Sequence, residues 1–171
     1  MNDSRQPPHD EMGDGRDFEA FYAREFRSVV GLAYALSGSR SRAEDLAQEA
    51  FVAVLRKWDE VARFDDPGAW VRRVTANRSV SWYRRVAAES RALLRLGNSD
   101  GGSPQLDIEA ESLWAEVRRL APRQAQVIAL HYVDQRTVPE IGRILECSEN
   151  TVKTHLQRAR NTLARRLKEH L

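Results

Sequence analysis

The spacing of apolar residues predicts helices along most of the chain. Between residues 18 and 36 apolar side chains recur every three or four positions, which is the period of an amphipathic helix. The same period runs through residues 42–58 and again through residues 67–95. No segment alternates apolar and polar residues over a stretch long enough to indicate a half-buried strand. We therefore predict an all-α fold.

Short polar segments separate these helices and supply residues that can cap them. Either Ser39 or Ser41 is expected to cap the second helix, since a serine hydroxyl accepts a hydrogen bond from a free backbone N–H of the first turn. Asp66 followed by Pro67 has the order of an N-cap and a first helical residue. The pattern thus predicts three helices in the N-terminal part of the chain.

Composition divides the chain into two small helical domains joined by a flexible linker. Residues 1–16 are rich in Pro, Gly and Asp and are expected to form a disordered tail. Residues 17–95 form the first predicted domain and residues 107–171 the second. Residues 96–106 lie between them and contain Gly, Ser and Asn, which supply flexibility and no core.

The second domain is expected to end in a helix-turn-helix. Helical segments are predicted near residues 107–119, 122–132, 137–145 and 149–167. Ser148 is a plausible N-cap for the last of them. One face of this last helix is apolar, and the other face with its cap carries polar side chains: Ser148, Asn150, Thr151, Lys153, Thr154, Gln157 and Arg158. Such a face suits a helix in the major groove of DNA, although an amphipathic pair in a plain bundle has the same period.

Charge is unevenly distributed, although the net charge is only +2. Residues 63–95 hold eight arginines against three acids, and residues 123–171 hold nine basic against five acidic side chains. Between them, residues 96–122 hold five acids against two arginines. Two basic blocks indicate two contacts with a polyanion such as DNA, or two solvated helical surfaces.

Several classes of protein are disfavoured by what the sequence contains. Cys147 is the single cysteine, which excludes an intramolecular disulfide and agrees with a cytoplasmic location. It does not have metal-ligand spacing with any of the four histidines, so no metal or cofactor is expected. No phosphate-binding loop or nucleophile motif is present, which argues against an enzyme. No signal peptide and no membrane span are expected, because the N-terminus is polar and no apolar stretch is long enough.

The C-terminal sequence APRQAQVIALHYVDQRTVPEIGRILECSENTVKTHLQRARNTL resembles region 4 of the extracytoplasmic-function (ECF) sigma factors. In that family this domain reads the −35 promoter element, which implies this role for the polar face of the last helix. The segment TVKTH is also similar to the output domains of response regulators. The positions Glu146 and Cys147 often hold Leu and Gly in the family, so the turn is expected to be slightly altered.

The N-terminal sequence RAEDLAQEAFVAVLRKW resembles region 2.2 of the same family, which docks on the clamp helices of the polymerase β′ subunit. The resemblance implies this role for Asp45, Leu46, Gln48, Glu49 and Phe51. An acidic face fits such docking, because its charges would orient the partner.

The following sequence, FDDPGAWVRRVTANRSVSWYRRV, resembles regions 2.3 and 2.4, which open the −10 element and bind its non-template strand. The resemblance implies this role for Phe64, Asp65, Asp66, Trp70, Arg73, Asn77, Ser81 and Arg84. Aromatic rings can stack on unpaired bases, and neighbouring arginines can bind the phosphates of the strand. Core packing is an alternative for Trp70 and Trp82. Many members of the family have Asp at the position of Ser81. The Ser81–Trp82 pair resembles instead an actinobacterial subgroup of the SigE kind, which has a similar variant.

The two resemblances, in order, predict a sigma factor that is not itself an enzyme. They imply core RNA polymerase as a partner, through its β′ clamp and β flap, together with promoter DNA. An anti-sigma factor is a further candidate partner. The linker is expected to let the domains sit on both promoter elements at once, joined by the tether and the polymerase rather than by a rigid interface. A free-standing helix-turn-helix regulator and a helical protein adaptor are the alternatives.

Overall fold

The structure, a computed structural model, describes the backbone of residues 11–95 and 108–169 and the side chains of residues 17–92 and 111–168. These residues form helices and no strand, which confirms the predicted all-α class. The helices are α1 (Glu11–Ser37), α2 (Arg40–Leu55), α3 (Trp58–Val61), α4 (Pro67–Arg95), α5 (Ile108–Arg118), α6 (Pro122–Tyr132), α7 (Val138–Leu145) and α8 (Glu149–Glu169). Helix α1 begins inside the segment predicted to be a disordered tail, and the predicted linker lies outside the described residues.

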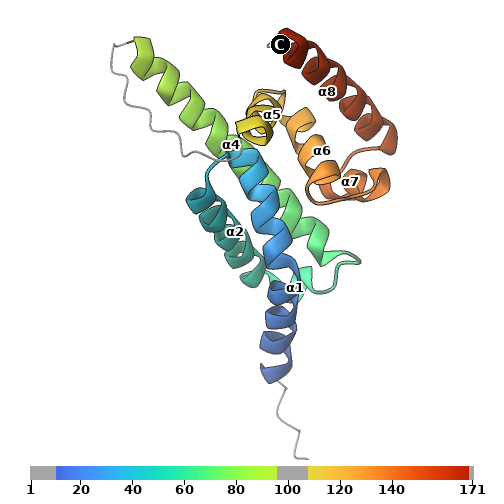
Figure 1. Cartoon of the computed structure of the whole chain (residues 1–171). Coiled ribbons are helices and arrows are strands. Elements are labelled where there is room, and N and C mark those ends of the chain that lie inside the picture. The colour runs from blue at the N-terminus through green and yellow to red at the C-terminus, as the bar shows by residue number, and fades with distance from the viewer. Residues whose placement is uncertain (1–10, 96–107, 170–171) are drawn as a thin grey trace, which may run out of the picture.

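The N-terminal half is a bundle of α1, α2 and α4, in which α1 packs against both other helices (Figure 1). An aromatic cluster fills one end of it. The ring centroid of Phe21 lies 5.8 Å from that of Phe51 and 5.1 Å from that of Trp58. Trp58 belongs to the short α3 and not to α2, because a turn at Arg56 and Lys57 interrupts the helix predicted to run through it. In the predicted apolar stripe of α1, Phe21 and Val29 are buried in this core, and Phe18, Tyr22 and Phe26 are partly buried against it.

The predicted caps of this half are present. Ser39 precedes α2 in extended conformation, and its side chain accepts a hydrogen bond from the backbone N–H of Arg42. Asp66 accepts one from the backbone N–H of Ala69 over 3.0 Å, with Pro67 as the first residue of α4. Each cap is worth about 1 kcal/mol, because it satisfies a helix N–H that has no intrahelical partner.

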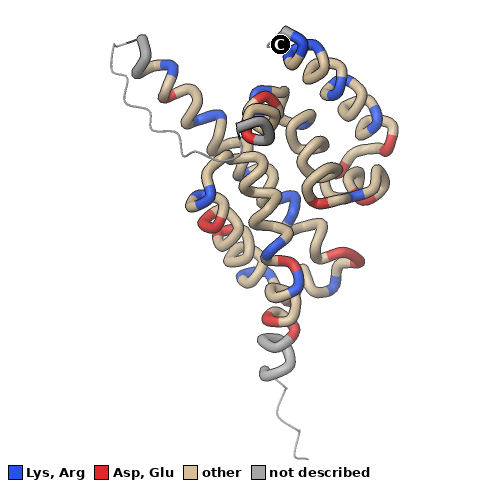
Figure 2. Tube along the Cα trace, in the orientation of Figure 1, with Lys and Arg blue, Asp and Glu red and all other residues tan. Residues whose placement is uncertain are grey.

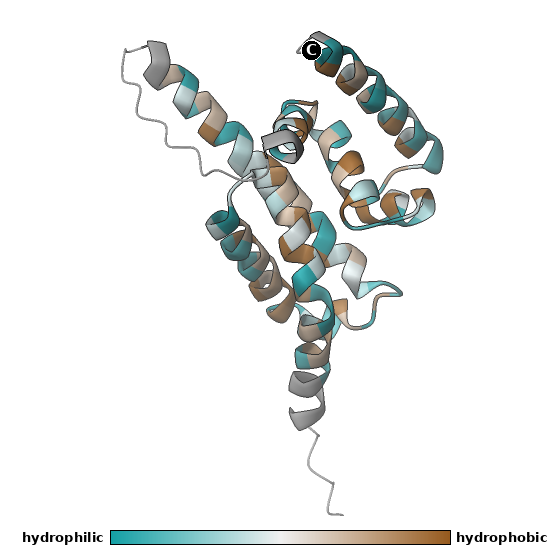
Figure 3. Ribbon diagram, viewed as in Figure 1, coloured by the Kyte–Doolittle hydropathy of each residue, from teal (hydrophilic) through white to brown (hydrophobic). Residues whose placement is uncertain are grey.

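The C-terminal half packs α5, α6 and α7 around the inner face of α8. The hydropathy colours show this face as brown patches along α8, opposite a teal outer face (Figure 3). Val152, Leu156, Ala159 and Leu163 are buried on it, as predicted. The Ser148 hydroxyl accepts a hydrogen bond of 3.1 Å from the backbone N–H of Thr151, which confirms the predicted cap.

The turn between α7 and α8 depends on two backbone positions. Glu146 ends α7 in the left-handed region, at φ 53°, a conformation that a residue with a Cβ adopts at a cost. The backbone N–H of Cys147 then donates to the carbonyl of Gly142 over 2.9 Å. A Cβ on Gly142 would lie 2.9 Å from the Cys147 carbonyl oxygen, so only glycine fits there without a shift of the turn.

The two halves share a hydrophobic core. Leu32 and Leu36 of α1 and Ala76 and Val80 of α4 belong to the same buried cluster as the apolar residues of α6, α7 and α8. Helix α4 contacts α6 and α7, and α1 contacts α5 and α6. The chain therefore forms one packed body, an arrangement for which the sequence pattern offers no signal.

We predict that Gly142→Ala destabilises the protein by about 1–3 kcal/mol, because its Cβ meets backbone that cannot move independently of the turn. Gly31→Ala is the matched control within α1. Its Cβ would lie 3.8 Å from Val133 Cγ1, an ordinary contact, so higher helix propensity should stabilise the chain by about 0.5–1 kcal/mol. Urea unfolding of both variants measures the difference. Equal effects of the two substitutions would contradict this account of the turn.

Candidate nucleic-acid interface

Four of the residues expected to bind the −10 element form a stripe on α4. Arg73, Asn77, Ser81 and Arg84 follow one another at intervals of four, four and three residues, so they share one side of the helix. Asn77, Ser81 and Arg84 are exposed and Arg73 is half-buried. Phe64 lies in the turn before α4 with 40% of its surface exposed, which is unusual for a phenylalanine. The stripe and this ring together could hold an unpaired strand.

Three other residues of the expected −10 set differ in how freely they could reach DNA. Asp65 is exposed beside Phe64. Asp66 already accepts the capping hydrogen bond of α4, so one of its oxygens has a structural task. Trp70 is half-buried against the core of the N-terminal half, which supports the packing role that the sequence left open for it.

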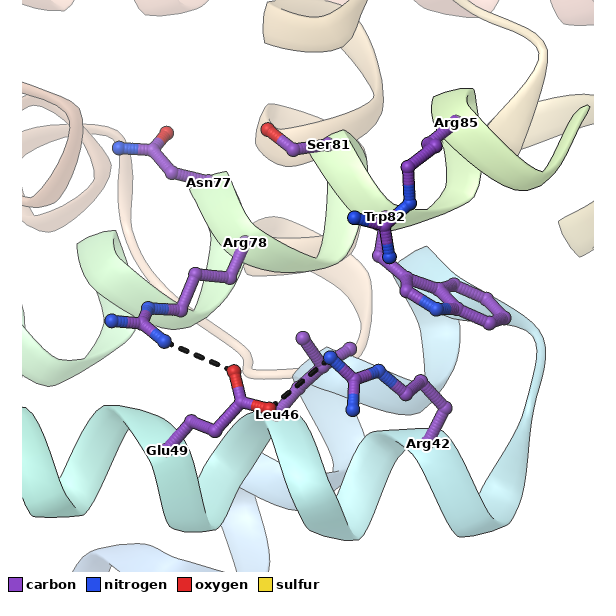
Figure 4. A pocket seen from close by; sticks show the side chains of 8 residues that line it. All are labelled: Arg42, Leu46, Glu49, Asn77, Arg78, Ser81, Trp82 and Arg85. Atoms are coloured by element: carbon purple, nitrogen blue, oxygen red, sulfur yellow. Dashed lines mark hydrogen bonds and ion pairs between the residues drawn. The ribbon is translucent and has the colours of Figure 1, made fainter. Parts of the chain in front are cut away.

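Beside the stripe, a cleft of about 310 Å³ opens between α2 and α4 (Figure 4). It is lined by Arg42, Leu46, Glu49, Asn77, Arg78, Ser81, Trp82 and Arg85. Trp82 is half-buried against Leu46 and Ala43 and still borders the cleft, so packing and ligand contact are compatible for it. Arg78 and Arg85 were not singled out from sequence. Their spacing of seven residues, which places them on one side of a helix with Trp82 between, is the signal that could have identified them.

The outer face of α2, expected to bind a protein, is only partly available. Asp45 and Gln48 are exposed. Glu49 forms ion pairs of 3.1 Å with Arg42 and 3.0 Å with Arg78, and thereby ties α2 to α4. Contact with a partner is therefore most direct for Asp45 and Gln48.

The positions of Leu46 and Phe51 differ from the expectation that both residues lie on the surface that docks a partner. They are only 1% and 2% exposed, because both point into the bundle, Leu46 against Ala33 and Phe51 into the aromatic cluster. Their side chains hold α2 in place and do not face a partner. Val52 and Leu55 of the same helix are instead 47% and 52% exposed.

The expected −35 residues are all exposed on α8 or at its start. Lysine and arginine segments recur along the helix (Figure 2). The Gln157 amide donates a hydrogen bond of 3.1 Å to the Asn161 side chain, and the Thr154 hydroxyl donates one of 2.9 Å to the Asn150 carbonyl. Both hydrogen bonds join residues of α8 to each other, so they do not tie its outer face to another helix.

His155 adds no charge to this face near neutral pH. Burial lowers the pKa of His155, and the neighbouring guanidinium groups of Arg158 and Arg123 lower it further. The positive charge of the predicted recognition surface therefore comes from Lys153 and Arg158.

Within the described residues, no group of three or more His, Cys, Asp or Glu side chains is arranged to hold a metal ion. None of the helices that the structure describes combines the length and hydropathy of a membrane-spanning segment.

Two family models match the two halves in the predicted order. The model of sigma-70 region 2 matches residues 21–89, and the model of sigma-70 region 4 matches residues 110–163. The chain belongs to the sigma-70 family. Helices α1 to α4 therefore constitute its region 2, and α5 to α8 its region 4.

Two sigma factors are similar to this chain at low sequence identity. The chain is 28% identical over 148 residues to an RNA polymerase sigma-E factor of Streptomyces avermitilis, covering 86% of this chain and 83% of that protein. It is 26% identical over 173 residues to the probable RNA polymerase sigma factor RfaY of Xanthomonas campestris, covering 94% of this chain. The chain spans only 42% of the length of RfaY. The first of these agrees with the predicted resemblance to a SigE-like group.

A solved structure has the same fold. The sigma factor RpoE, crystallised with the anti-sigma factor NepR from Bartonella quintana, is similar with a TM-score of 0.64 at 21% identity. The match covers 90% of this chain and 98% of that one.

Proposed function

We propose that this protein is a promoter-specificity subunit that binds core RNA polymerase in the cytoplasm and directs it to a class of promoters. Region 2 reads the −10 element, region 4 reads the −35 element, and the polymerase carries out catalysis. The observation that carries the proposal is the presence, on one chain, of two basic helical faces with different chemistry. One combines Phe64 with the α4 stripe, and the other is the exposed face of α8.

The region 2 surface has the chemistry that an opened −10 element needs. A base that leaves the duplex loses its stacking, at a cost of a few kcal/mol, and a ring or pocket must compensate for it. Phe64 can stack on an unpaired base, while Arg73 and Arg84 can contact phosphates. The cleft beside Trp82 is large enough for a base and is bordered by Arg78 and Arg85.

The region 4 surface has the chemistry of duplex reading. Gln157 can donate to and accept from adenine in the major groove, while Lys153 and Arg158 can bind either guanine or phosphate. Ser148, Asn150, Thr151 and Thr154 at the start of the helix can contact base edges or the backbone.

Core polymerase is proposed to dock on α2 through Asp45 and Gln48, with the exposed Val52 and Leu55 as apolar neighbours. Charges at such a surface orient the partner, and apolar contacts add affinity. Region 4 is proposed to contact the β flap. RpoE is seen with an anti-sigma factor, which supports the proposal that this chain also binds one.

We predict that Asp45→Lys weakens binding to core polymerase several-fold, mainly through slower association, because the reversed charge is exposed at the docking face. Asp45 makes only an exposed ion pair of 3.5 Å with Arg42, so helicity should be unchanged. Glu19→Lys, the same charge reversal at an exposed position of α1, is the control. Fluorescence anisotropy with labelled protein measures both affinities, and equal binding by the two variants would rule out this docking face.

We predict that Gln157→Ala changes base preference within the −35 element and leaves the −10 preference unchanged. Loss of one bidentate contact reduces discrimination by about 1–3 kcal/mol at that position. A selection from randomised promoters, read by run-off transcription, measures the preference at each position.

Asn161→Ala is the matched control, since it removes the same intrahelical hydrogen bond and keeps the Gln157 amide. If it reproduced the change in preference, or if Gln157→Ala altered the −10 preference, Gln157 would not be reading the −35 element.

A further inference from the structure

An exposed tyrosine and an exposed arginine are paired across α6 and α8, outside the set of residues proposed to read the −35 element. Tyr132, the last residue of α6, has 53% of its surface exposed. The Arg160 guanidinium lies over its ring, 5.7 Å from the centroid. The Arg160 Nε also donates a hydrogen bond of 2.9 Å to the Tyr132 hydroxyl. Two exposed side chains are therefore held against each other in one defined geometry.

A second contact limits the motion of the Tyr132 ring. The ring of His131 meets it edge-on, with the centroids 4.8 Å apart and an interplanar angle of 81°. His131 Nδ1 lies 3.1 Å from the Arg136 carbonyl oxygen, and because a carbonyl can only accept, this nitrogen donates. The end of α6 is thus fastened to the segment that follows it, and Tyr132 offers Arg160 a fixed partner.

The pair keeps most of its hydrogen-bonding capacity for a ligand. A phenol has one O–H donor besides the oxygen that accepts, and a guanidinium has five N–H donors. Among the side chains that the structure describes, the bond between Arg160 Nε and the Tyr132 hydroxyl is the one side-chain hydrogen bond of either residue, and neither forms an ion pair. The Tyr132 hydroxyl proton and the Arg160 Nη groups can therefore be donated together to one anion with several oxygens.

The charge along α8 favours such an anion. From Asn150 to Lys168 the helix contains six lysines and arginines and no aspartate or glutamate. Arginine binds phosphate through two parallel N–H donors, and these charge-assisted hydrogen bonds are stronger than those between neutral groups. A phosphate of a nucleic acid therefore has the chemistry that the pair would recognise.

The position of Arg160 on α8 places the pair beside the proposed base-reading residues. Arg160 follows Lys153 by seven residues, which is two turns, so both lie on one side of the helix. It lies about 16 Å along the axis from the start of α8 at Glu149, whereas the major groove is about 12 Å wide and 8.5 Å deep. With the first turns of α8 at the base edges, Arg160 comes level with the sugar–phosphate backbone that borders the groove.

We propose that Tyr132 and Arg160 form a phosphate-binding site that contacts the DNA backbone at the border of the −35 element. Arg160 supplies the charge, and Tyr132 is a positioning residue that orients the guanidinium and adds one donor. The site rests on the proposed function for its ligand, the duplex bound by α8. A phosphate contact carries no sequence information, so the pair adds affinity and fixes the helix in the groove, whereas Gln157 supplies discrimination.

Arg160→Ala should weaken binding to a −35 duplex about tenfold, because a charge-assisted hydrogen bond to phosphate is lost. The loss should be equal for a duplex with a selected −35 sequence and for a scrambled one. The slope of log affinity against log salt should fall by about one, since one phosphate contact releases about one counterion. Arg27→Ala, which removes an exposed arginine from α1 of region 2, is the matched control and should change neither quantity.

Tyr132→Phe tests the positioning role, because it keeps the ring beneath the guanidinium and removes only the hydroxyl. It should weaken binding about two- to fivefold and leave the salt slope unchanged, since no charge is lost. In the Arg160→Ala background the same substitution should have a smaller effect, because the hydroxyl acts largely through Arg160. Equal effects in both backgrounds would show that Tyr132 does not position Arg160.

The measurement is the fluorescence anisotropy of labelled duplexes that carry the −35 element alone. They are titrated, over a series of salt concentrations, with the full-length chain in complex with core polymerase, and the affinity of each variant for core is measured separately. Unchanged DNA affinity and salt slope in Arg160→Ala, or a loss confined to the selected sequence, would overturn the proposal. Weaker core binding with unchanged DNA affinity of the assembled complex would also overturn it, and would identify the pair as a protein contact.

The same titrations separate this site from the proposed function. A parent complex that binds selected and scrambled duplexes equally would refute the proposed reading of the −35 element. A salt slope that is still lowered by Arg160→Ala would then leave the phosphate site standing. A parent complex with a clear preference, in which Arg160→Ala behaves like Arg27→Ala, would refute the site and leave the proposed function intact.

Discussion

The structure depends on how one buried arginine is neutralised. Taking a guanidinium out of water costs several kcal/mol unless carboxylates and hydrogen bonds compensate for it, and Arg72 is almost fully buried. Burial alone would raise the pKa of Glu25, but hydrogen bonds from Arg24 and Arg72 lower it, so this carboxylate stays ionised. Asp134 supplies the other negative charge from region 4. Because neither half contains both acids, the charge is best satisfied when the halves are packed together.

This constraint also sets the position of the proposed DNA-reading residues. Arg72 and Arg73 are adjacent on α4, so fixing the first against region 4 brings the second to the helix-turn-helix turn, where Glu146 binds it. One helical turn further, Asn77 meets Gln126. The outer face of α8 takes no part in these contacts and stays exposed. Contacts with region 4 therefore reach Arg73 and Asn77 of the proposed −10 surface, whereas Ser81, Arg84 and the proposed −35 surface stay exposed.

Much of the fold could be predicted from sequence because its signals are local. Helical periodicity and the caps at Ser39, Asp66 and Ser148 depend on residues within one turn of each other. The same helical period predicted which face of α8 is polar and which is apolar. Leu46 and Phe51 were assigned to a docking surface from the family pattern, which does not reveal on which side of α2 a residue lies. The Arg72–Asp134 pair joins residues 62 positions apart, and no periodic signal marks such a partner.

Calorimetric unfolding of the free full-length chain tests most directly whether the two halves form one body. A shared apolar core and a buried ion network across the interface predict a single transition, in which the calorimetric enthalpy equals the van 't Hoff enthalpy. Two separate transitions, or a calorimetric enthalpy well above the van 't Hoff value, would show that regions 2 and 4 unfold independently and would contradict the account.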